Sequence, residues 1–295
     1  MTEPMRISAF FDETSHTVSY LVVDPATRAA AIIDAVLDYD HRAGRADVTS
    51  AGRILAVAEQ LSARVEWVLE THVHADHLTA APWLKAKTGA KTGIGAEVAQ
   101  VQKIFRPVFD LADVSLDGAE FDRLFADGDH FAIGGLDVEV LHTPGHTPAC
   151  VSYRIGDAVF VGDTVFMPDY GAARADFPGG SARALYRSIR RLLALPPETR
   201  MFLCHDYKPP GRDHFVWETT VAAQRAENVQ VHDGVSEEEF VAMRHKRDAE
   251  LAAPELLLPS IQVNIRAGRF PRAESQGARF LRIPVKLAPE LDAVV

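Results

Sequence analysis

The stretch that most constrains this 295-residue chain is THVHADH, residues 71–77, which holds three histidines and one aspartate. Histidine accounts for 12 of the 295 residues, so such a cluster at fixed spacing arises by chance in roughly one chain in a thousand of this length. Imidazole nitrogens and a carboxylate are ligands that divalent transition metals prefer. The stretch therefore predicts a metal site, and solvated or packed histidines are the less favoured interpretation.

The pattern of apolar residues places this cluster at the end of a strand. Residues 49–63 carry apolar side chains at helical spacing after a Thr-Ser start, and residues 64–72 then read as a strand that ends at the histidines. In open α/β folds, the loops at the carboxyl ends of strands gather ligands. The location therefore favours a functional site over a packed core.

The remaining elements predict a mixed fold of helices and strands. Two buried strands are expected at residues 17–24 and 28–36, and the Asp-Gly, Gly-Gly and Pro-Gly turns within residues 123–166 predict a run of antiparallel hairpins. A Ser236/Glu239 capping box predicts the start of a helix. After residue 77 we expect helices at residues 78–89, 97–109, 181–196 and 236–253. We also expect a strand at residues 200–207 and a late strand and loop at residues 259–270.

Three more residues of ligand type follow predicted strands. His146 lies in the Pro-Gly loop of HTPGHTPAC, Asp163 follows the apolar strand in FVGDTVF, and His205 ends the strand in FLCHDY. Each is a weak indication alone, because a loop histidine is usually a surface residue and a Gly-Asp pair usually a turn. Together with residues 71–77 they place ligand-type side chains at four strand ends, which we expect to converge on one centre.

The composition indicates which partners and which cellular compartment to expect. With 31 Lys and Arg against 41 Asp and Glu, the formal net charge is −10, which disfavours nucleic acid and anionic membrane surfaces as partners. The N-terminal stretch contains Glu3 and Asp12 and no apolar core of a secretory signal, and no apolar run approaches the roughly 20 residues that span a bilayer. Cys150 and Cys204 are the only cysteines, which fits buried neutral thiols in a reducing cytoplasm.

In order and spacing, THVHADH, TPGHT, the Gly-Asp pair and CHDY resemble the metallo-β-lactamase superfamily over about residues 15–210. The resemblance implies a four-layer αββα sandwich of the α/β (α+β) class, with two mixed sheets face to face, helices outside and a metal site at one edge. We expect a single domain over residues 1–295, with a helical extension and a terminal strand or loop from about residue 215. In the superfamily pattern, Asp163 bridges two metals, whose other ligands are His72, His74 and His146 for the first and Asp76, His77 and His205 for the second.

Longer stretches narrow the resemblance to the persulfide dioxygenases, in particular a bacterial branch associated with sulfide oxidation. These stretches are ETHVHADHLTAAPWLK, HTPGHTPACVSY, GDTVF, CHDY, MPDYGAARADFPGG and PSIQVNIRAG. The resemblance implies one Fe(II) per chain, held by His72, His146 and Asp163, which leaves open positions for substrate and O₂. The other residues of the pattern, which would orient these ligands or hold a water, are His74, Asp76, His77 and His205. The implied homodimeric enzyme converts glutathione persulfide, or a similar low-molecular-weight persulfide, and O₂ to sulfite and free thiol.

Three residues are candidates for direct roles in catalysis. Tyr207 matches a tyrosine that the family places near the iron, where its hydroxyl would donate to substrate or oxygen; a packed strand-end ring explains it equally well. Arg174 matches a loop arginine that would set the loop's geometry or meet an anionic thiol carrier, and a surface arginine is the alternative. Asp76 is the third candidate. The loop of residues 167–180 is two residues longer than in animal members and has Tyr170 where they carry a cysteine, so that cysteine's role does not transfer.

Two other functions remain as alternatives. The same ligand set would serve a dinuclear zinc hydrolase resembling glyoxalase II, which cleaves acyl-glutathione thioesters through a bridging hydroxide. Zinc has no redox chemistry, so the identity of the metal largely decides the class of reaction. A metal-binding sensor without turnover is the third interpretation, which the complete set of ligand residues disfavours.

Overall fold

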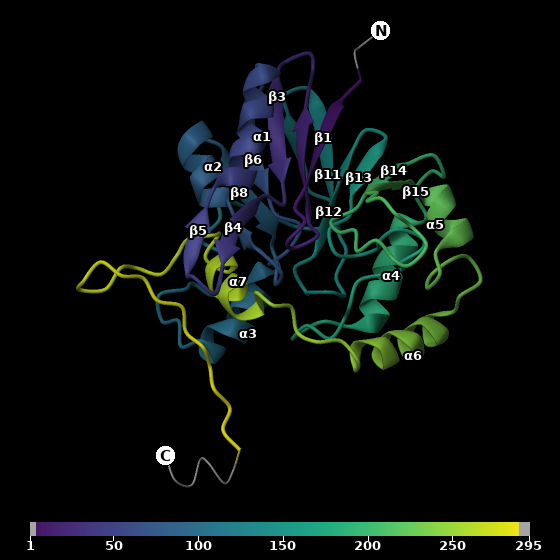
Figure 1. Ribbon diagram of the computed structural model, residues 1–295. Helices are drawn as coiled ribbons and strands as arrows, with labels where there is room; N and C mark the ends of the chain where they lie inside the picture. The colour runs from purple at the N-terminus through teal and green to yellow at the C-terminus, as the bar shows by residue number, and fades with distance from the viewer. Residues whose placement is uncertain (1–3, 289–295) are drawn as a thin grey trace.

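The computed structural model describes residues 4–288 and shows two sheets packed face to face with helices on both outer sides (Figure 1). The first sheet contains, in spatial order, β1 (Arg6–Phe11), β2 (Val18–Val23), β3 (Ala29–Ile33), β6 (Arg64–Leu69), β8 (Lys91–Gly95) and β9 (Arg123–Phe125). The second contains β10 (His130–Ile133), β11 (Leu136–His142), β12 (Val151–Ile155), β13 (Ala158–Phe160), β14 (Arg200–Phe202) and β15 (Glu218–Thr220). Both sheets mix parallel and antiparallel pairs. The expected αββα sandwich is confirmed.

Helices and a small third sheet complete the fold. The helices are α1 (Thr49–Gln60), α2 (Ala81–Thr88), α3 (Val98–Val108), α4 (Ala182–Leu192), α5 (Val221–Glu227), α6 (Glu237–Asp248) and α7 (Leu257–Asn264). The third sheet joins β5 (Arg45–Asp47), β4 (Val36–Asp40) and β7 (Leu78–Thr79). None of the helices within residues 4–288 combines the length and the apolar character needed to cross a bilayer.

The central core lies between the two large sheets, because each strand turns alternate apolar side chains toward the facing sheet. Tyr20 and Leu69 of the first sheet pack with Val140, Tyr153 and Phe160 of the second. The buried phenols of the two tyrosines remain hydrogen-bonded, because Tyr20 donates to a backbone carbonyl at 2.5 Å and Tyr153 to another at 2.9 Å. The second of these bonds ends on the carbonyl of the residue just before the histidine cluster and so ties that segment to the second sheet.

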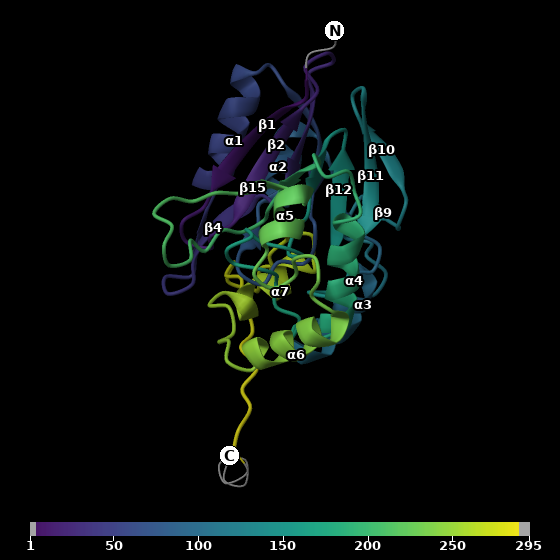
Figure 2. The same ribbon diagram turned by 90° about the vertical axis from the view of Figure 1, so that its right-hand side faces the viewer.

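The outer layers follow from helices with one apolar face. Ile54 of α1 and Leu84 of α2 pack against the outer face of the first sheet. Leu185 and Ile189 of α4, together with Phe240 of α6, cover the outer face of the second sheet. Figure 2 shows α4 and α5 lying along the second sheet, with α6 crossing below them. The Ser236/Glu239 capping box is present and starts α6 as predicted.

Two elements differ from the sequence-based expectation. β9 is expected to begin the run of hairpins, but it pairs parallel with β8 at the edge of the first sheet. β10–β13 form the expected antiparallel ladder. The late strand expected within residues 259–270 is wrong, because residues 257–264 form α7. Its apolar residues pack against α3 through Ile261. A short apolar run does not distinguish a buried helix from a buried strand.

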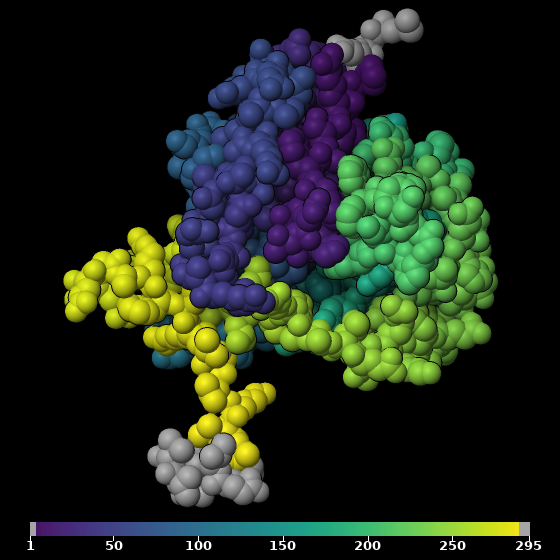
Figure 3. Space-filling view, in the orientation of Figure 1, coloured from purple at the N-terminus to yellow at the C-terminus, as the bar shows by residue number. Residues whose placement is uncertain are grey.

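The region after residue 215 holds the last three helices of the described chain and one short strand. It contains β15, α5, α6 and α7, and residues 271–288 form neither helix nor strand. Figure 3 shows this last part, in yellow, leaving the body of the molecule. The predicted single domain of residues 1–295 includes a few residues at both ends that lie outside the described range, and it stays a prediction.

Candidate metal centre

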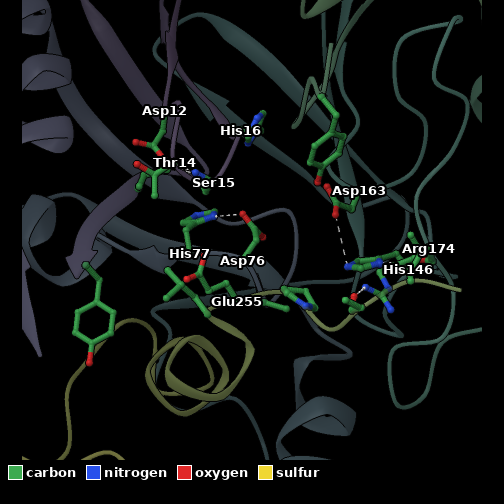
Figure 4. A pocket seen from close by; sticks show the side chains of 18 of the residues that line it. Asp12, Thr14, Ser15, His16, Asp76, His77, His146, Asp163, Arg174 and Glu255 are labelled. Atoms are coloured by element: carbon green, nitrogen blue, oxygen red, sulfur yellow. Dashed lines mark hydrogen bonds and ion pairs between the residues drawn. The ribbon is translucent and has the colours of Figure 1, made fainter. Parts of the chain in front are cut away.

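The loops that follow four strands meet at one edge of the sandwich. The histidine cluster follows β6, His146 lies between β11 and β12, Asp163 follows β13, and His205 follows β14. The histidines in this set are at most 4% exposed and Asp163 is 7% exposed. Figure 4 shows His146 and Asp163 facing Asp76 and His77 across the site. The structure therefore brings the ligand-type residues of all four sequence stretches into one buried centre.

His72, His146 and Asp163 form one group of donor atoms. One nitrogen of each histidine and one carboxylate oxygen lie within 4.8 Å of one another. Asp163 Oδ2 is 4.0 Å from His72 Nε2 and 3.6 Å from His146 Nε2. Two histidines and one carboxylate at these separations suit a single metal ion that keeps further positions open.

A second group lies on the other side of Asp163. His205 Nε2 is 3.2 Å from Asp163 Oδ1 and 3.8 Å from Asp76 Oδ2, and donor atoms of His74, Asp76 and His77 lie within 4.8 Å of one another. The two oxygens of Asp163 thus face different groups. The arrangement can hold one ion beside His72 and His146, and a second beside His205.

The residues fit a metal because their inward atoms have no hydrogen-bond partner outside this centre. The buried atoms without a hydrogen-bond partner among the described residues include His72 Nε2, His74 Nδ1, His77 Nε2, Asp163 Oδ1 and His205 Nε2. An unsatisfied buried polar atom costs about 1–3 kcal/mol, and a cluster of several needs a compensating partner. A divalent cation supplies that partner for imidazole nitrogens and a carboxylate together.

The outward ring nitrogens of two ligands are fixed by backbone carbonyls. His146 Nδ1 donates to the carbonyl of Arg174 at 2.9 Å, and His205 Nδ1 donates to that of His16 at 3.2 Å. Because a carbonyl only accepts, the proton must sit on Nδ1 in both rings. When each ring is neutral, the lone pair of Nε2 is therefore the one directed inward.

Asp34 fixes two more of the five rings, those of His72 and His74, and sequence reasoning did not single it out. Its Oδ1 accepts from His74 Nε2 at 3.0 Å, and its Oδ2 accepts from the Thr71 hydroxyl at 2.8 Å. Since Thr71 gives its proton to Asp34, it accepts from His72 Nδ1, 3.0 Å away. Asp34 follows the buried strand β3, so a carboxylate at the end of an apolar run was the signal that could have found it.

Asn264 is a second supporting residue that sequence reasoning missed. It closes α7, and its side-chain nitrogen donates to the carbonyls of His74 and His77 at 2.9 and 2.8 Å. Its oxygen accepts from the backbone nitrogen of Thr79 at 3.0 Å. Three hydrogen bonds of one buried side-chain amide therefore fix the backbone of the loop that carries His74 and His77. Nothing in the sequence near residue 264 indicates this role.

Burial and neighbouring charges divide the histidines into two kinds in the metal-free protein. Burial lowers the pKa of His72 well below its usual value, so this ring is neutral and ready to bind at pH 7. Burial also acts on His205, but the carboxylates of Asp163 and Asp76 outweigh it and raise its pKa to about 9. Burial alone would also lower the pKa of His74, but the negative charge of Asp34 outweighs it and the pKa is raised well above its usual value. Metal binding beside His205 must therefore displace a proton.

The structure places the other two catalytic candidates at different distances from the donor atoms. The Tyr207 ring stacks on His205 with centroids 5.4 Å apart and lines the cleft beside the centre. The Arg174 guanidinium pairs with Asp176 and donates to the carbonyl of Ala252 at 2.8 Å. Arg174 thus meets His146 through its backbone, while its side chain holds the loop.

The two cysteines are buried and protonated. Burial raises the pKa of the Cys150 thiol to about 12 and that of Cys204 well above its usual value. Cys204 lies beside Asp163 and His205, yet its sulfur is 3.6 Å from Asp34 Oδ2 and acts as the donor there. Both cysteines therefore remain neutral thiols, as the sequence suggested.

A cleft of about 850 Å³ opens onto the donor atoms. Its inner end includes Asp76, His77, His146 and Asp163, and its walls come from the N-terminal residues 12–16, the third sheet and the segment after α6. Figure 3 shows it as a recess between the purple N-terminal part and the lime C-terminal part. Such a volume accommodates a small-molecule substrate.

The sequence pattern of the Metallo-beta-lactamase superfamily matches residues 13–205, which include every ligand-type residue of the centre. The chain belongs to this superfamily. The family assignment fits a centre in which a metal ion binds at the edge of an αββα sandwich, and the buried donor groups of this superfamily member are of the kind that binds metal.

The more similar curated relatives of this superfamily member carry hydrolase or glyoxalase names. A probable metallo-hydrolase of Burkholderia pseudomallei is 51% identical over 95% of this chain and 99% of that protein. Glyoxylase B2 of Dictyostelium discoideum is 46% identical over 97% of this chain and 98% of its own length. The chain covers only 64% of a 50% identical beta-lactamase hydrolase-like protein of Xylella fastidiosa.

Persulfide dioxygenases are less similar to this chain in sequence than the relatives above, but a related crystal structure superposes on most of the chain. The mitochondrial persulfide dioxygenase ETHE1 of Bos taurus is 29% identical over 90% of this chain and 89% of that protein. The crystal structure of ETHE1 from Myxococcus xanthus superposes with a TM-score of 0.72 and 32% identity, over 90% of this chain and all of that one. This member of the superfamily is thus similar both to proteins named as metallo-hydrolases and to persulfide dioxygenases.

Proposed function

We propose that this protein is an iron-dependent dioxygenase that oxidises glutathione persulfide or a similar low-molecular-weight persulfide. The reaction R–S–SH + O₂ + H₂O gives R–SH and sulfite with two protons. Fe(II) would be held by His72, His146 and Asp163, and when bound it supplies the redox chemistry that oxygen transfer to sulfur requires. The small-molecule partners and a homodimeric assembly are parts of the same proposal, and the assembly is tested by light scattering.

One observation supports this proposal over a dinuclear centre. The donor atoms of His72, His146 and Asp163 form a compact group, whereas His74 groups with Asp76 and His77 instead. His74 is also bonded to Asp34, whose charge favours the protonated ring. Because burial lowers the pKa of His72, this ring binds a metal at neutral pH without losing a proton, whereas His74 must lose one.

The chain's own residues would position the substrate. A persulfide is anionic once ionised, and the partly open end of the three-residue group lies at the bottom of the cleft. The aromatic rings of Phe166 and Tyr207 line the same wall and would exclude water from the sulfur. Because burial raises the Tyr207 pKa well above its usual value, its hydroxyl stays protonated and is available as a hydrogen-bond donor.

A metal-dependent hydrolase acting on acyl-glutathione thioesters is the second candidate. Two observations favour it: the more similar relatives are named metallo-hydrolase and Glyoxylase B2, and the unpartnered nitrogens of His77 and His205 offer ligands for a second ion. Two zinc ions would supply an activated water instead of redox chemistry. The names of the relatives support this candidate more strongly than they support the dioxygenase.

The deciding experiment compares the same preparation loaded anaerobically with Fe(II) or with Zn(II). Metal content, O₂ uptake with glutathione persulfide, sulfite production and hydrolysis of S-lactoylglutathione are measured on each sample. One iron per chain with O₂ uptake and no thioesterase activity supports the dioxygenase. Two zinc ions with thioester hydrolysis, and no O₂ uptake from the iron sample, replace it with the hydrolase.

Variants make the comparison sharper. His205→Gln and Asp76→Asn remove ligands of the second group only, so a mononuclear dioxygenase keeps one iron and measurable O₂ uptake in both. His72→Gln removes a ligand of the first group and abolishes either activity. A protein that binds metal and shows neither activity would instead support a sensor without turnover.

A further inference from the structure

Arg247, on the last turns of α6, is an unpaired cation on the wall of the cleft. The cleft is also lined by Arg42, Arg174 and Arg244, and within residues 4–288 each of these pairs with an acid. Arg247 alone among them makes no ion pair and no side-chain hydrogen bond within the described chain, and it is exposed. Its guanidinium is therefore free to meet a ligand.

None of the acidic residues that line the cleft makes an ion pair with Arg247 in the described chain, and their side chains bind other groups. Asp38 accepts from Ser50, and Asp40 accepts from two backbone nitrogens of the turn that follows it. Glu255 lies 3.3 Å from His41 and 3.6 Å from the paired Arg42. In a chain of net charge −10, an arginine left without an acid at a cleft wall is a specific feature and not part of a general basic surface.

A row of aromatic rings connects the metal centre with Arg247. Tyr207 stacks on His205 at 5.4 Å, and Tyr170 lies against Tyr207 with ring centroids 5.0 Å apart. Tyr170 and Arg247 both line the cleft, and the positive charge of Arg247 acts against the rise that burial causes in the pKa of the Tyr170 phenol. The wall therefore runs from the donor atoms, along two flat apolar faces, to a free cation.

We propose that Arg247 binds a carboxylate of the substrate, at the end remote from its sulfur. The aromatic row would cover the stem between the two ends, and guanidinium is well suited to bind a carboxylate with two parallel hydrogen bonds. The substrate class is then a small thiol carrier with a carboxylate several bonds from the sulfur. This inference rests on the proposed function only in assigning the sulfur end to the metal centre, and it applies equally to a persulfide and to a thioester.

Binding of an unreactive ligand tests the inference without turnover. S-methylglutathione and its dimethyl ester, which lacks both carboxylates, are titrated calorimetrically into the zinc-loaded protein. Arg247→Gln is expected to raise the Kd of the acid about tenfold, as loss of a charge-assisted contact does, and to leave the Kd of the ester unchanged. Lys246→Gln is the matched control, because it removes an exposed cation from the adjacent position of the same helix, and it should change neither value.

Several outcomes would overturn the inference. They are equal weakening of both ligands by Arg247→Gln, no weakening of either, equal weakening by the control, or no binding of the acid to the unchanged protein. With whichever thiol substrate turns over, KM should rise about as much as Kd while kcat stays near its original value. A fall in kcat at constant KM would also overturn it, since that places Arg247 at the reacting atoms. The calorimetric result stands even if the protein consumes no persulfide, so the two proposals fail separately.

Discussion

Nδ1 of His146 donates to the carbonyl oxygen of Arg174 at 2.9 Å, so the backbone of one loop sets the ring orientation of a ligand on another. The Arg174 side chain makes this possible by pairing with Asp176 and by binding the carbonyl of Ala252. Arg174 is therefore a positioning residue, whose effect on the metal passes through His146.

Arg174→Ala should weaken metal binding. Loss of the pair with Asp176 loosens the loop that carries the carbonyl, and removing such a supporting contact costs about tenfold or more in metal affinity. Asp176→Asn should have a similar effect. The Kd for Zn(II) is measured by chelator competition. Arg183→Ala is the control, because it breaks exposed ion pairs between α4 and Glu237 and Glu238 of α6. It should leave the Kd unchanged, and an equal loss of zinc affinity in this variant would refute the positioning role.

Asn264→Ala should destabilise the metal-free protein by about 2–4 kcal/mol, because it leaves two carbonyls and one amide of the ligand loop buried without partners. Urea unfolding in the presence of a chelator measures the change. Ser260→Ala, one turn earlier on α7, is the matched control. The Ser260 hydroxyl is buried and has no partner among the described residues, so its removal should cost less than about 1 kcal/mol. Similar losses in both variants would show that α7 contributes only packing.

Gly162→Ala should impair the centre more than an equivalent change elsewhere. Gly162 has φ = 54°, and a Cβ there would lie 2.6 Å from the Thr71 side chain, directly before Asp163. Gly156 has φ = 59° and nothing within 4 Å of an added Cβ. Gly156→Ala should therefore show only the strain of the backbone conformation, about 1 kcal/mol. Gly162→Ala should lose more stability and also bind zinc more weakly, and equal effects on stability and Kd would contradict this reading.

The metal-free protein should lose stability as the pH rises from about 6.5 to about 9. The pKa of His205 is raised to about 9 in the folded protein, against about 6.5 for a free imidazole. A raised histidine pKa stabilises the folded state fully below the lower value, and this contribution disappears as the pH passes the higher one. The free energy of unfolding in chelator is measured at pH 6.5, 7.5 and 9.

His205→Gln should flatten part of this pH dependence, and the remaining slope would come from His74, whose pKa is also raised. Zinc added at pH 7 should release protons from the unchanged protein, because His205 must be neutral to bind a metal. Unchanged pH dependence in the variant would show that His205 is not the titrating group.

The ligand-type residues and the sandwich could be predicted because they depend on short, local patterns. THVHADH and the residues at three later strand ends identify the donor atoms without any knowledge of packing, since each follows a recognisable strand. The route of β9 could not be predicted in this way. Three residues at Arg123–Phe125 pair with β8 across the first sheet, and the choice between two sheets depends on long-range contacts and not on the turns beside it.

The residues that support the centre were harder to find than the residues that form it. Asp34 and Asn264 act through contacts 40 and 190 residues away in sequence from His74, so no local spacing indicates them. The segment around Asn264 also reads as a strand because its apolar residues form one short run. In the structure the same residues are helical, since that conformation lets them pack on α3 while the terminal amide reaches the ligand loop.

The position of α7 has a consequence for the smallest unit that can carry this chemistry. The superfamily pattern ends at residue 205, and that segment holds every ligand. The hydrogen bonds under the ligand loop nevertheless come from Asn264, almost sixty residues further along the chain. A protein shortened after its last ligand would keep all the donors but leave them on an unsupported loop. Transplanting this centre into another scaffold would therefore require the C-terminal helices as well.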